Sequence, residues 1–485
     1  MSGEKQKDEN LKSKTKKGLI WSTLGNVVNQ GMRFILGLIL ARLLDPDAFG
    51  VIGMLTIFIC VISIFIDCGF SQALIAKQDR TKIDYSTEFW FNVVVGFVGY
   101  LILFIISPFV ADFYDMEILS PILRVIGLGV FINSLCVVQS AQLSIRLDFK
   151  TPAKIGVVSQ LVSGIIGVIL AYCGYGVWAL VFQQLIGALL NSICLWLVVR
   201  WIPSFEFSKE SFKYLWGYGG KVLMTSIITQ IHDNIYPLII GKFYSSASLG
   251  LYSRAQGFAA LPSSNIAGIL GNVTFPVLCS VNGDMEKFAL VYRKLVRLSA
   301  FIVFPLMLGM LALSEPMIHV LLNAQWNGCI PYLQVLCFAM IWQPVSLVNL
   351  NLLKAAKRTD VLLKLDIIKR GVGLIILILT CQVSVMAIAI GYAFLALFSV
   401  ILNTVFTSKV LNVSFMDQLW DIALIFLNST VMSILVYALS YVVSNDIAFL
   451  VIGIIVGLAY YLLSSNLFFK DEMQNVMYML KKKTA

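Results

Sequence analysis

The sequence is poor in the residues that build a soluble surface. Only 13% of its 485 residues are charged, whereas 59% are hydrophobic, and an average soluble domain carries about 25% charged residues. The connectors between its apolar stretches are shorter than about twenty residues, too short for an ordinary domain. These shortages exclude a soluble globular protein and leave no room for a soluble domain between the apolar stretches.

Residues typical of metal sites and catalytic centres are also scarce. The chain has two histidines and nine cysteines, and no two cysteines form a Cys-x-x-Cys motif, so neither a zinc site nor a disulfide framework is indicated. The sequence has no phosphate-binding P-loop, no Gly-x-Ser-x-Gly motif and no paired carboxylates in an external loop. We therefore predict no catalytic residues, no metal and no nucleotide site.

What the sequence has instead is a series of fourteen apolar runs, each long enough to cross a bilayer. A spanning helix needs about 20 mostly apolar residues. Hydrocarbon offers the backbone no hydrogen-bond partner, so such runs must be helical. The predicted spans are residues 18–41, 48–70, 88–111, 118–138, 155–172, 176–199, 217–241, 251–279, 298–314, 330–353, 362–381, 384–407, 418–441 and 446–468. The pattern predicts an all-α polytopic membrane protein.

The positive charge follows the same pattern. Of the 36 Lys and Arg residues, thirty fall in the two tails or in every second connector, and the intervening connectors are nearly free of them. Cytoplasmic loops carry an excess of Lys and Arg, so this alternation places those connectors and both termini in the cytoplasm. Membrane orientation thus explains the net charge of +10, and we predict no nucleic-acid partner.

Charged residues also occur within or near the predicted spans. Bringing a charge to the middle of a bilayer costs about 2.5–3.5 kcal/mol on insertion scales. We therefore expect these side chains to face water or one another, in a bundle that encloses a polar cavity. The bases are Arg33, Arg42, Arg124, Lys221, Lys242 and Arg254, and the acids are Asp67 and Asp233.

An internal repeat appears when the chain is shifted by 200 residues, which aligns the first predicted span with the seventh. Identical residues then meet at positions 30, 35, 38, 39 and 50 and at positions 230, 235, 238, 239 and 250. Both spans start on the cytoplasmic side, so the repeats would be parallel, related by an axis along the membrane normal. The predicted parts are a basic tail (1–17), an N-lobe of six helices (18–200), a C-lobe of six helices (201–412), two further helices (413–468) and a second basic tail (469–485).

The same shift aligns two polar stripes. The first span carries Asn26, Asn29, Gln30 and Arg33 on one helical face, and the seventh carries Ser226, Thr229, Gln230 and Asp233 at the equivalent positions. The second span has a thinner stripe of Thr56, Cys60, Ser63 and Asp67. Such stripes line a cavity or form hydrogen bonds between packed helices, and the sequence leaves both readings open.

Arg33 and Arg124 are the candidates for binding an anionic phosphate or pyrophosphate, because arginine stays charged and binds phosphate with two parallel hydrogen bonds. The alternative for each is a structural pair with an acid. Asp67 and Asp233 are candidates for coupling to H⁺ or Na⁺, or for neutralising the arginines. No other cofactor is expected. The remaining predicted residues of the substrate cavity are Asn26, Asn29, Gln30, Lys221, Thr229 and Gln230.

Several segments stand along the chain in a recognisable order and spacing. They are ARLLDPDAFG (41–50), IDCGFSQALIAK (66–77), RLDFK (146–150), GYGVWALVFQQL (174–185), GLYSRAQGFAALP (250–262), Phe275-Pro276 and Phe304-Pro305. Together they resemble the Wzx-type polysaccharide flippases of bacteria, close to the colanic-acid and teichuronic-acid exporters. That family belongs to the multidrug/oligosaccharidyl-lipid/polysaccharide exporter superfamily. The resemblance runs from the first span to about the twelfth, and one departure is Asp45-Pro46-Asp47-Ala48, where the family often has Thr-Pro-Glu-Asp.

The resemblance implies two six-helix lobes around a central cavity. It also implies a non-enzymatic transporter that moves an undecaprenyl-pyrophosphate-linked oligosaccharide across the bacterial cytoplasmic membrane, coupled to an ion gradient. The product would be a surface polysaccharide such as lipopolysaccharide O-antigen, capsule or exopolysaccharide. Membrane lipids and a polymerase or export machinery are the further partners. A multidrug or cation antiporter, a lipid II flippase and a membrane glycan polymerase are the alternatives. Embedded bases outnumber acids six to two, which disfavours the first, and the short external loops disfavour the last.

Overall fold

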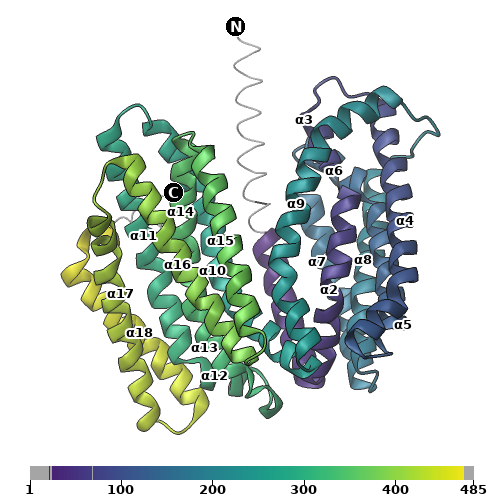
Figure 1. Cartoon of the computed structure of the whole chain (residues 1–485). Coiled ribbons are helices and arrows are strands. Elements are labelled where there is room, and N and C mark those ends of the chain that lie inside the picture. Colours follow the sequence, from purple (N-terminus) through teal and green to yellow (C-terminus); the bar gives the residue numbers. More distant parts are fainter. Residues whose placement is uncertain (1–20, 22–24, 68, 475–485) are drawn as a thin grey trace. The chain divides into compact units, whose positions relative to one another are not determined.

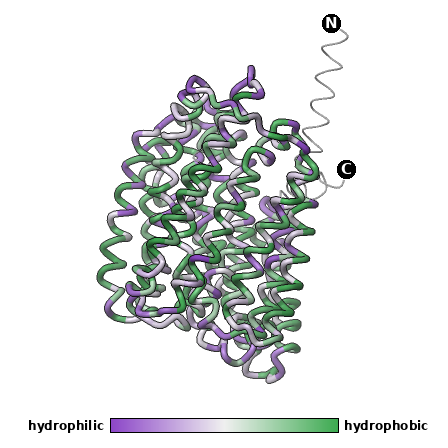
Figure 2. Tube along the Cα trace, turned by 90° about the vertical axis from the view of Figure 1, so that its right-hand side faces the viewer, coloured by the Kyte–Doolittle hydropathy of each residue, from purple (hydrophilic) through white to green (hydrophobic). Residues whose placement is uncertain are grey.

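The computed structural model describes residue 21, residues 25–67 and residues 69–474, and for Asp67, Tyr218 and Lys221 it describes the backbone alone. All regular secondary structure in these residues is helical (Figure 1). Hydrophobic residues run along most of the length of the helices, and hydrophilic residues gather mainly at their ends and in the loops (Figure 2). The predicted basic tail 1–17 and the end of the tail 469–485 lie outside the described residues.

Eleven helices in the described part of the chain are long and apolar enough to cross a membrane. The prediction of an all-α, multi-pass membrane protein is therefore confirmed. The three other predicted spans, 18–41, 217–241 and 362–381, fall on the helix over residues 25–43, on α9 (Lys209–Phe243) and on α15 (Thr359–Thr380). Both α9 and α15 carry several charged residues, and the count of fourteen spans stays a prediction.

The chain divides by its internal contacts into a first unit, Met1–Gly250, and a second unit, Leu251–Ala485. Within the first unit α9 packs against α2, α3 and α4. The predicted lobe boundary at residue 200 stays a prediction. The first unit holds the helix over residues 25–43, α2 (Pro46–Asp67), α3 (Phe70–Ala76), α4 (Lys82–Tyr114), α5 (Leu119–Ser134), α6 (Val137–Ile145), α7 (Lys150–Tyr172), α8 (Val177–Val199), α9 and the first turn of α10 (Ser246–Val281).

The second unit holds the rest of α10 and eight further α-helices. In it α11 packs against α13, α14 and α17, and α18 packs against α12 and α17. Its helices after α10 are α11 (Met285–Ala312), α12 (Ser314–Leu321), α13 (Cys329–Met340), α14 (Gln343–Ala355), α15 (Thr359–Thr380), α16 (Val385–Leu411), α17 (Phe415–Ala438) and α18 (Asp446–Phe468).

Short polar side chains cap the N-termini of several long helices. Thr81 and Asp84 form a capping box at the start of α4, in which each side chain bonds the other residue's backbone amide. Ser208, Asp284 and Asn445 accept a backbone N–H at the starts of α9, α11 and α18. The backbone N–H of Lys287, which Asp284 accepts, holds the pKa of that exposed carboxyl below its usual value. Local sequence thus sets where these helices begin.

Three of the predicted continuous spans are broken in the structure. Gly69 adopts a left-handed φ of 70°, which only glycine adopts readily, and separates α2 from α3. Residues 135–136 separate α5 from α6, and residues 341–342 separate α13 from α14. Pro344 lies in the first turn of α14, where its missing N–H costs no helical hydrogen bond. Hydropathy alone did not show these breaks, because its average over the length of a span stays high across each of them.

The start of α2 and the start of α10 approach each other unusually closely. A Cβ atom on Gly50 would overlap the carbonyl oxygen of Ser246, and one on Gly250 would overlap the carbonyl oxygen of Pro46. The two contacts are equivalent, because Gly250 lies 200 residues after Gly50 and Ser246 lies 200 residues after Pro46. The same offset of 200 residues relates the two polar stripes. The structure therefore agrees with the internal repeat at this point, and the approach requires glycine at both positions.

Candidate functional site

A polar pocket with a volume of about 620 Å³ lies inside the first unit. Arg33 is the basic residue in its wall, and most of the other polar side chains there are neutral amides and hydroxyls. We call it the amide pocket. The helix over residues 25–43, α2, α5, α7 and α8 contribute to it, and its polar lining residues are Asn29, Arg33, Asn133, Ser159, Gln160, Ser163, Gln183, Gln184 and Asn191.

The helix over residues 25–43 turns Asn29 and Arg33 into this pocket because it packs closely along α7. A Cβ atom on Gly156 would lie 3.0 Å from the Asn29 amide nitrogen, and one on Gly164 would overlap the Leu36 side chain. Asn29 meets a residue 127 positions later in the chain, and Leu36 meets one 128 positions later. Because this difference stays nearly constant along the contact, the two helices run parallel. Arg33 lies between Asn29 and Leu36 at helical spacing, on the same face.

The amide pocket combines one positive charge with polar atoms that have no partner. Among the described residues, Arg33 forms no ion pair. The buried Asn29 Oδ1 and Ser159 Oγ atoms have no hydrogen-bond partner there either. Buried polar atoms are normally hydrogen-bonded, to the protein or to bound molecules. The arrangement can hold a ligand that offers one anionic group and several hydroxyl groups.

The predicted polar stripes of the second and seventh spans meet in another pocket of the first unit. Its volume is about 290 Å³. Cys60 and Ser63 of α2 line it together with Ser226 and Gln230 of α9, and Gln72 of α3 joins them. We call it the α2–α9 pocket. For these residues the stripes do line a cavity, which was one of the two open readings.

Arg124, the second predicted anion-binding residue, does not line the amide pocket. Its Nε donates to Ser107 Oγ at 2.7 Å, and its guanidinium carbon lies 4.5 Å from the centre of the Phe104 ring. Both partners belong to α4, so Arg124 stabilises the packing of α5 on α4. The structure does not bring Arg33 and Arg124 into the same pocket.

The other predicted residues have varied surroundings. Asn26 and Asp233 are exposed, and Gln30 is half-buried. Thr229 is exposed and its hydroxyl donates to the backbone carbonyl of Thr225. The Asp67 and Lys221 side chains lie outside the description. The role predicted for each of these residues stays a prediction.

Sequence reasoning missed most of the amide pocket. Gln183 and Gln184 lie in the GYGVWALVFQQL segment, which served above only as a family motif. Gln160 and Asn191 are single amides in long apolar runs, and Asn133 lies near the end of α5. Polar residues in an apolar run were the available signal, but only the tertiary packing shows that these five converge.

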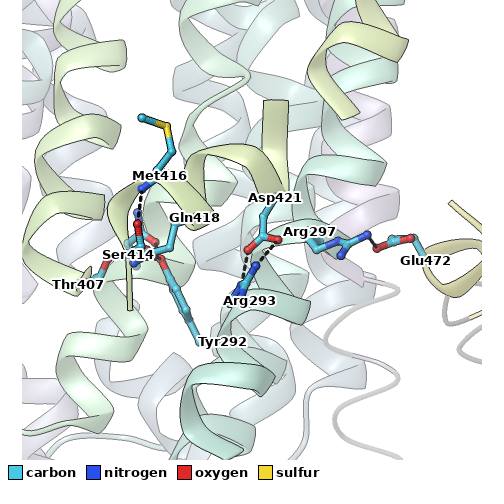
Figure 3. A network of polar contacts seen from close by, with 10 residues as sticks. Tyr292, Arg293, Arg297, Thr407, Ser414, Met416, Gln418, Asp421 and Glu472 are labelled. Atoms are coloured by element: carbon cyan, nitrogen blue, oxygen red, sulfur yellow. Dashed lines mark hydrogen bonds and ion pairs between the residues drawn. The ribbon is translucent and has the colours of Figure 1, made fainter. Parts of the chain in front are cut away.

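A third polar pocket, of about 820 Å³, lies in the second unit and is lined by basic and acidic residues. Arg293 forms a two-pronged ion pair with Asp421, with N–O distances of 2.6 and 2.9 Å. Arg297 pairs with Glu472 at 2.6 Å (Figure 3). Beside them the Tyr292 hydroxyl lies 3.0 Å from Gln418 Oε1. Because acids of the same chain hold both guanidinium groups, we interpret this network as a clamp that ties α17 and the segment after α18 to α11.

We expect the Asp421→Asn substitution to destabilise the protein by about 1–3 kcal/mol, the range for a hydrogen-bonded charged group. The Asp421 carboxylate is 7% exposed and is the ion-pair partner of Arg293. The substitution therefore removes the negative charge that balances the Arg293 guanidinium. The thermal unfolding midpoint in detergent measures the effect. The matched control is Asp360→Asn, whose pair with Arg358 is about half exposed on both sides, so solvent screens it and the midpoint should hardly change. Equal shifts for both variants would contradict the clamp.

The second unit also contains an apolar pocket of about 510 Å³. Side chains of α10, α11, α17 and α18 line it, and it has almost no polar surface. Gly453 and Gly457 of α18 open it between the larger side chains. An apolar chain would fit such a lining, because it brings no polar group that would need a hydrogen-bond partner there. No group of three or more His, Cys, Asp or Glu side chains that could hold a metal ion occurs among the described residues.

Comparison with known sequences identifies relatives along most of the chain. The profile of the family described as "Polysaccharide biosynthesis protein" matches residues 39–331. The Escherichia coli lipopolysaccharide biosynthesis protein WzxC is 25% identical over 449 residues, which is 90% of each chain. The Bacillus subtilis teichuronic acid biosynthesis protein TuaB is 25% identical over 382 residues, 78% of this chain and 79% of that one. The predicted resemblance to polysaccharide flippases is confirmed.

Comparison with solved structures identifies the fold. The lipid II flippase MurJ in an inward closed conformation matches with a TM-score of 0.76 and 17% identity, over 93% of this chain and 99% of that one. An inward-facing multidrug resistance MATE family transporter of the MOP superfamily matches with a TM-score of 0.61 and 14% identity, over 79% and 94%. At these identities the likeness shows the fold alone.

Proposed function

Because the chain belongs to the family of polysaccharide biosynthesis proteins, we propose that it is a flippase for a lipid-linked oligosaccharide. The substrate is an oligosaccharide on undecaprenyl pyrophosphate, and it moves from the inner to the outer leaflet of the bacterial cytoplasmic membrane. The protein acts as a secondary transporter rather than an enzyme. It works by alternating access, driven by an ion gradient, and both termini are cytoplasmic. A polymerase or export machinery then receives the translocated lipid-linked oligosaccharide.

The observation that carries this proposal is the composition of the amide pocket. A pyrophosphate-linked sugar offers an anionic group beside many hydroxyl groups. Arg33 is the charged ligand for a phosphate oxygen, and amides such as Gln160 and Gln183 donate to and accept from sugar hydroxyls. A pocket for a lipophilic drug cation would instead need apolar or acidic walls. The lining of this pocket therefore favours a sugar phosphate over a cationic drug.

The apolar pocket of the second unit supports a substrate with a hydrocarbon chain. Its walls, from Pro262 on α10 to Tyr461 on α18, are almost wholly apolar, as lipid tails are. A polyprenyl tail is long, flexible and without hydrogen-bonding groups, so it can leave lipid for such a wall without exposing the protein's polar groups to hydrocarbon. We propose that this pocket contacts part of the prenyl tail during transport.

A flipping assay with purified protein tests the proposal. Proteoliposomes contain a fluorescent undecaprenyl-pyrophosphate disaccharide, and a membrane-impermeant quencher reports which leaflet it occupies. We expect the wild-type protein to make nearly all of the label accessible and protein-free liposomes to leave the inner-leaflet label protected. Lipid II carrying the same fluorophore and the dye ethidium are the comparison substrates. Movement of ethidium without movement of the disaccharide lipid would contradict the proposal, and a preference for lipid II would assign the protein to peptidoglycan synthesis instead.

A further inference from the structure

The helices that line the amide pocket pack in a fixed register, which assigns a level to each of its polar side chains. A Cβ atom on Gly167 of α7 would lie 2.9 Å from the Gln183 side chain of α8. One on Gly187 of α8 would lie 3.2 Å from Ser163 Oγ of α7. Four residues back along α7 thus match four residues forward along α8, and neither helix is broken between the two contacts. The two helices therefore run antiparallel with one register.

Arg33 and two amides share one level of the pocket. Asn29 packs against Gly156, where the helix that carries Asn29 and Arg33 runs parallel to α7. Four residues further along both helices, Arg33 lies level with Gln160. The α7–α8 register places Asn191 within one residue of the same level. We call it the charge level, because Arg33 is the basic residue in the pocket wall.

Asn133 of α5 belongs to the charge level as well. A Cβ atom on Gly129 would lie 4.0 Å from the Ala188 side chain of α8. Further along both helices, Trp196 Nε1 donates to the Leu135 carbonyl oxygen at 3.0 Å. α5 and α8 therefore run in the same direction, and the α8 stretch between these two contacts, which holds the charge level, lies beside Asn133. A guanidinium group and three amides from four helices thus line the pocket at one level.

Gln183 and Gln184 line the pocket at a separate level, which we call the glutamine level. Gln183 lies against Gly167, seven residues beyond Gln160 on α7, a distance of about 10 Å along the helix at about 1.5 Å per residue. Side chains on a helix tilt toward its N-terminus. The two glutamines on α8 therefore tilt away from the charge level, and Arg33 tilts in the opposite direction, away from the glutamine level.

The predicted orientation of the chain gives these levels a direction. α7 begins on the cytoplasmic side in that orientation. The charge level then lies nearer the inner leaflet, where the lipid anchor of the proposed substrate starts, and the glutamine level lies nearer the outer side. A head group that enters from the cytoplasm with its sugars leading would bring its phosphate to Arg33 and its sugars toward the glutamines.

We propose that the amide pocket reads the order of the first groups of its substrate. The pyrophosphate and the sugar attached to it lie at the charge level, and Gln183 and Gln184 bind the next sugar. This inference rests on the proposed function and deepens it, because it makes these two glutamines the residues that select the second sugar. A carboxamide group both donates and accepts, as neighbouring sugar hydroxyl groups require. A substrate without matching hydroxyl groups leaves the amides unpaired and binds more weakly.

Equilibrium binding of three lipids to the purified protein in detergent tests the two levels. The lipids are undecaprenyl pyrophosphate, the disaccharide lipid of the flipping assay, and the same lipid with its outer sugar removed. We expect Arg33→Gln to weaken binding of all three at least about tenfold, because each keeps the pyrophosphate. The double variant Gln183→Leu/Gln184→Leu should weaken the disaccharide lipid alone, again at least about tenfold, and leave the other two within about twofold of the wild type.

Control variants separate recognition of the second sugar from a loss of folding. Gln184 is exposed, so Gln184→Leu by itself keeps the test open if the double variant does not fold, and it should weaken the disaccharide lipid about threefold. Gln78→Leu makes the same change at an exposed glutamine outside the pocket and should bind all three lipids as the wild type does. The thermal unfolding midpoint without lipid checks that each variant is folded.

Three results would overturn the two levels. They are a wild type that binds the disaccharide lipid no more tightly than the monosaccharide lipid, glutamine variants that weaken all three lipids alike, and glutamine variants that bind all three normally. A protein that binds the lipids in the expected order but does not flip the disaccharide lipid would keep the two levels and lose the proposed function. One that flips it while its glutamine variants bind all three lipids normally would keep the function and lose the levels.

Discussion

We expect Arg33→Glu to reduce flipping of the fluorescent disaccharide lipid at least about 30-fold, while the protein still folds in the membrane. The substitution removes the cation of the amide pocket and puts a carboxylate beside the expected phosphate. Losing a charge-assisted hydrogen bond costs about 1.5–3 kcal/mol, and like-charge contact adds to that. Arg33→Lys should be less damaging, because it keeps the charge and loses only the two-pronged geometry. The proteoliposome assay measures the rates.

Two comparison variants make this prediction specific. Arg124→Glu breaks the hydrogen bond to Ser107 and the contact with the Phe104 ring, so we expect a lower thermal unfolding midpoint and a smaller loss of flipping. Lys213→Glu makes the same charge reversal at an exposed position of α9 and should leave flipping unchanged. Normal flipping by Arg33→Glu would remove Arg33 from the transport mechanism. Equal losses at positions 33 and 124 would indicate that both contact the substrate.

The other large expected effect concerns the reciprocal approach of Gly50 and Gly250. The Gly50→Ala substitution places a methyl group on the backbone carbonyl of Ser246, and Gly250→Ala places one on the backbone carbonyl of Pro46. Backbone cannot rotate away as a side chain can, so we expect a cost at the upper end of the ~1–3 kcal/mol typical of overpacking. Thermal unfolding in detergent measures it, and a marked fall in the midpoint is expected for each variant.

The double variant and a control test the geometry of this approach. If the helix starts separate to admit the first methyl group, the second should cost less, so the Gly50→Ala and Gly250→Ala effects should be less than additive. Gly31→Ala is the matched control, because it lies in the helix over residues 25–43 with nothing within 4 Å of the added methyl group. It should be neutral or stabilising by up to about 1 kcal/mol. A neutral result at positions 50 and 250 would contradict the close approach.

The membrane class of this protein could be predicted from the sequence because it depends on sums over many residues. Hydropathy over about 20 residues identifies a span, and the alternation of Lys and Arg indicates its orientation. The breaks inside spans could not be predicted in this way. At Gly69 the break depends on a single backbone angle, and between α5 and α6 the hydropathy averaged over the length of a span stays high across it.

The candidate site was only partly accessible from the sequence. Asn29 and Arg33 could be found because they lie on one helical face, a local property. Arg124 looked equivalent to Arg33, since a single sequence does not show that Ser107, seventeen residues away on another helix, accepts its hydrogen bond. Gln160 and Gln183 each looked like an isolated polar residue in an apolar run.

By itself the sequence determined that the chain crosses a membrane many times and which family it resembles. These properties follow from local composition and motif order. Only the tertiary structure decided which polar side chains share a pocket, which bases are already held, and at which level of the amide pocket each side chain lies. The reason is physical: the surroundings of a side chain are set by helices that are distant in the sequence, and their register depends on close contacts such as Asn29 on Gly156.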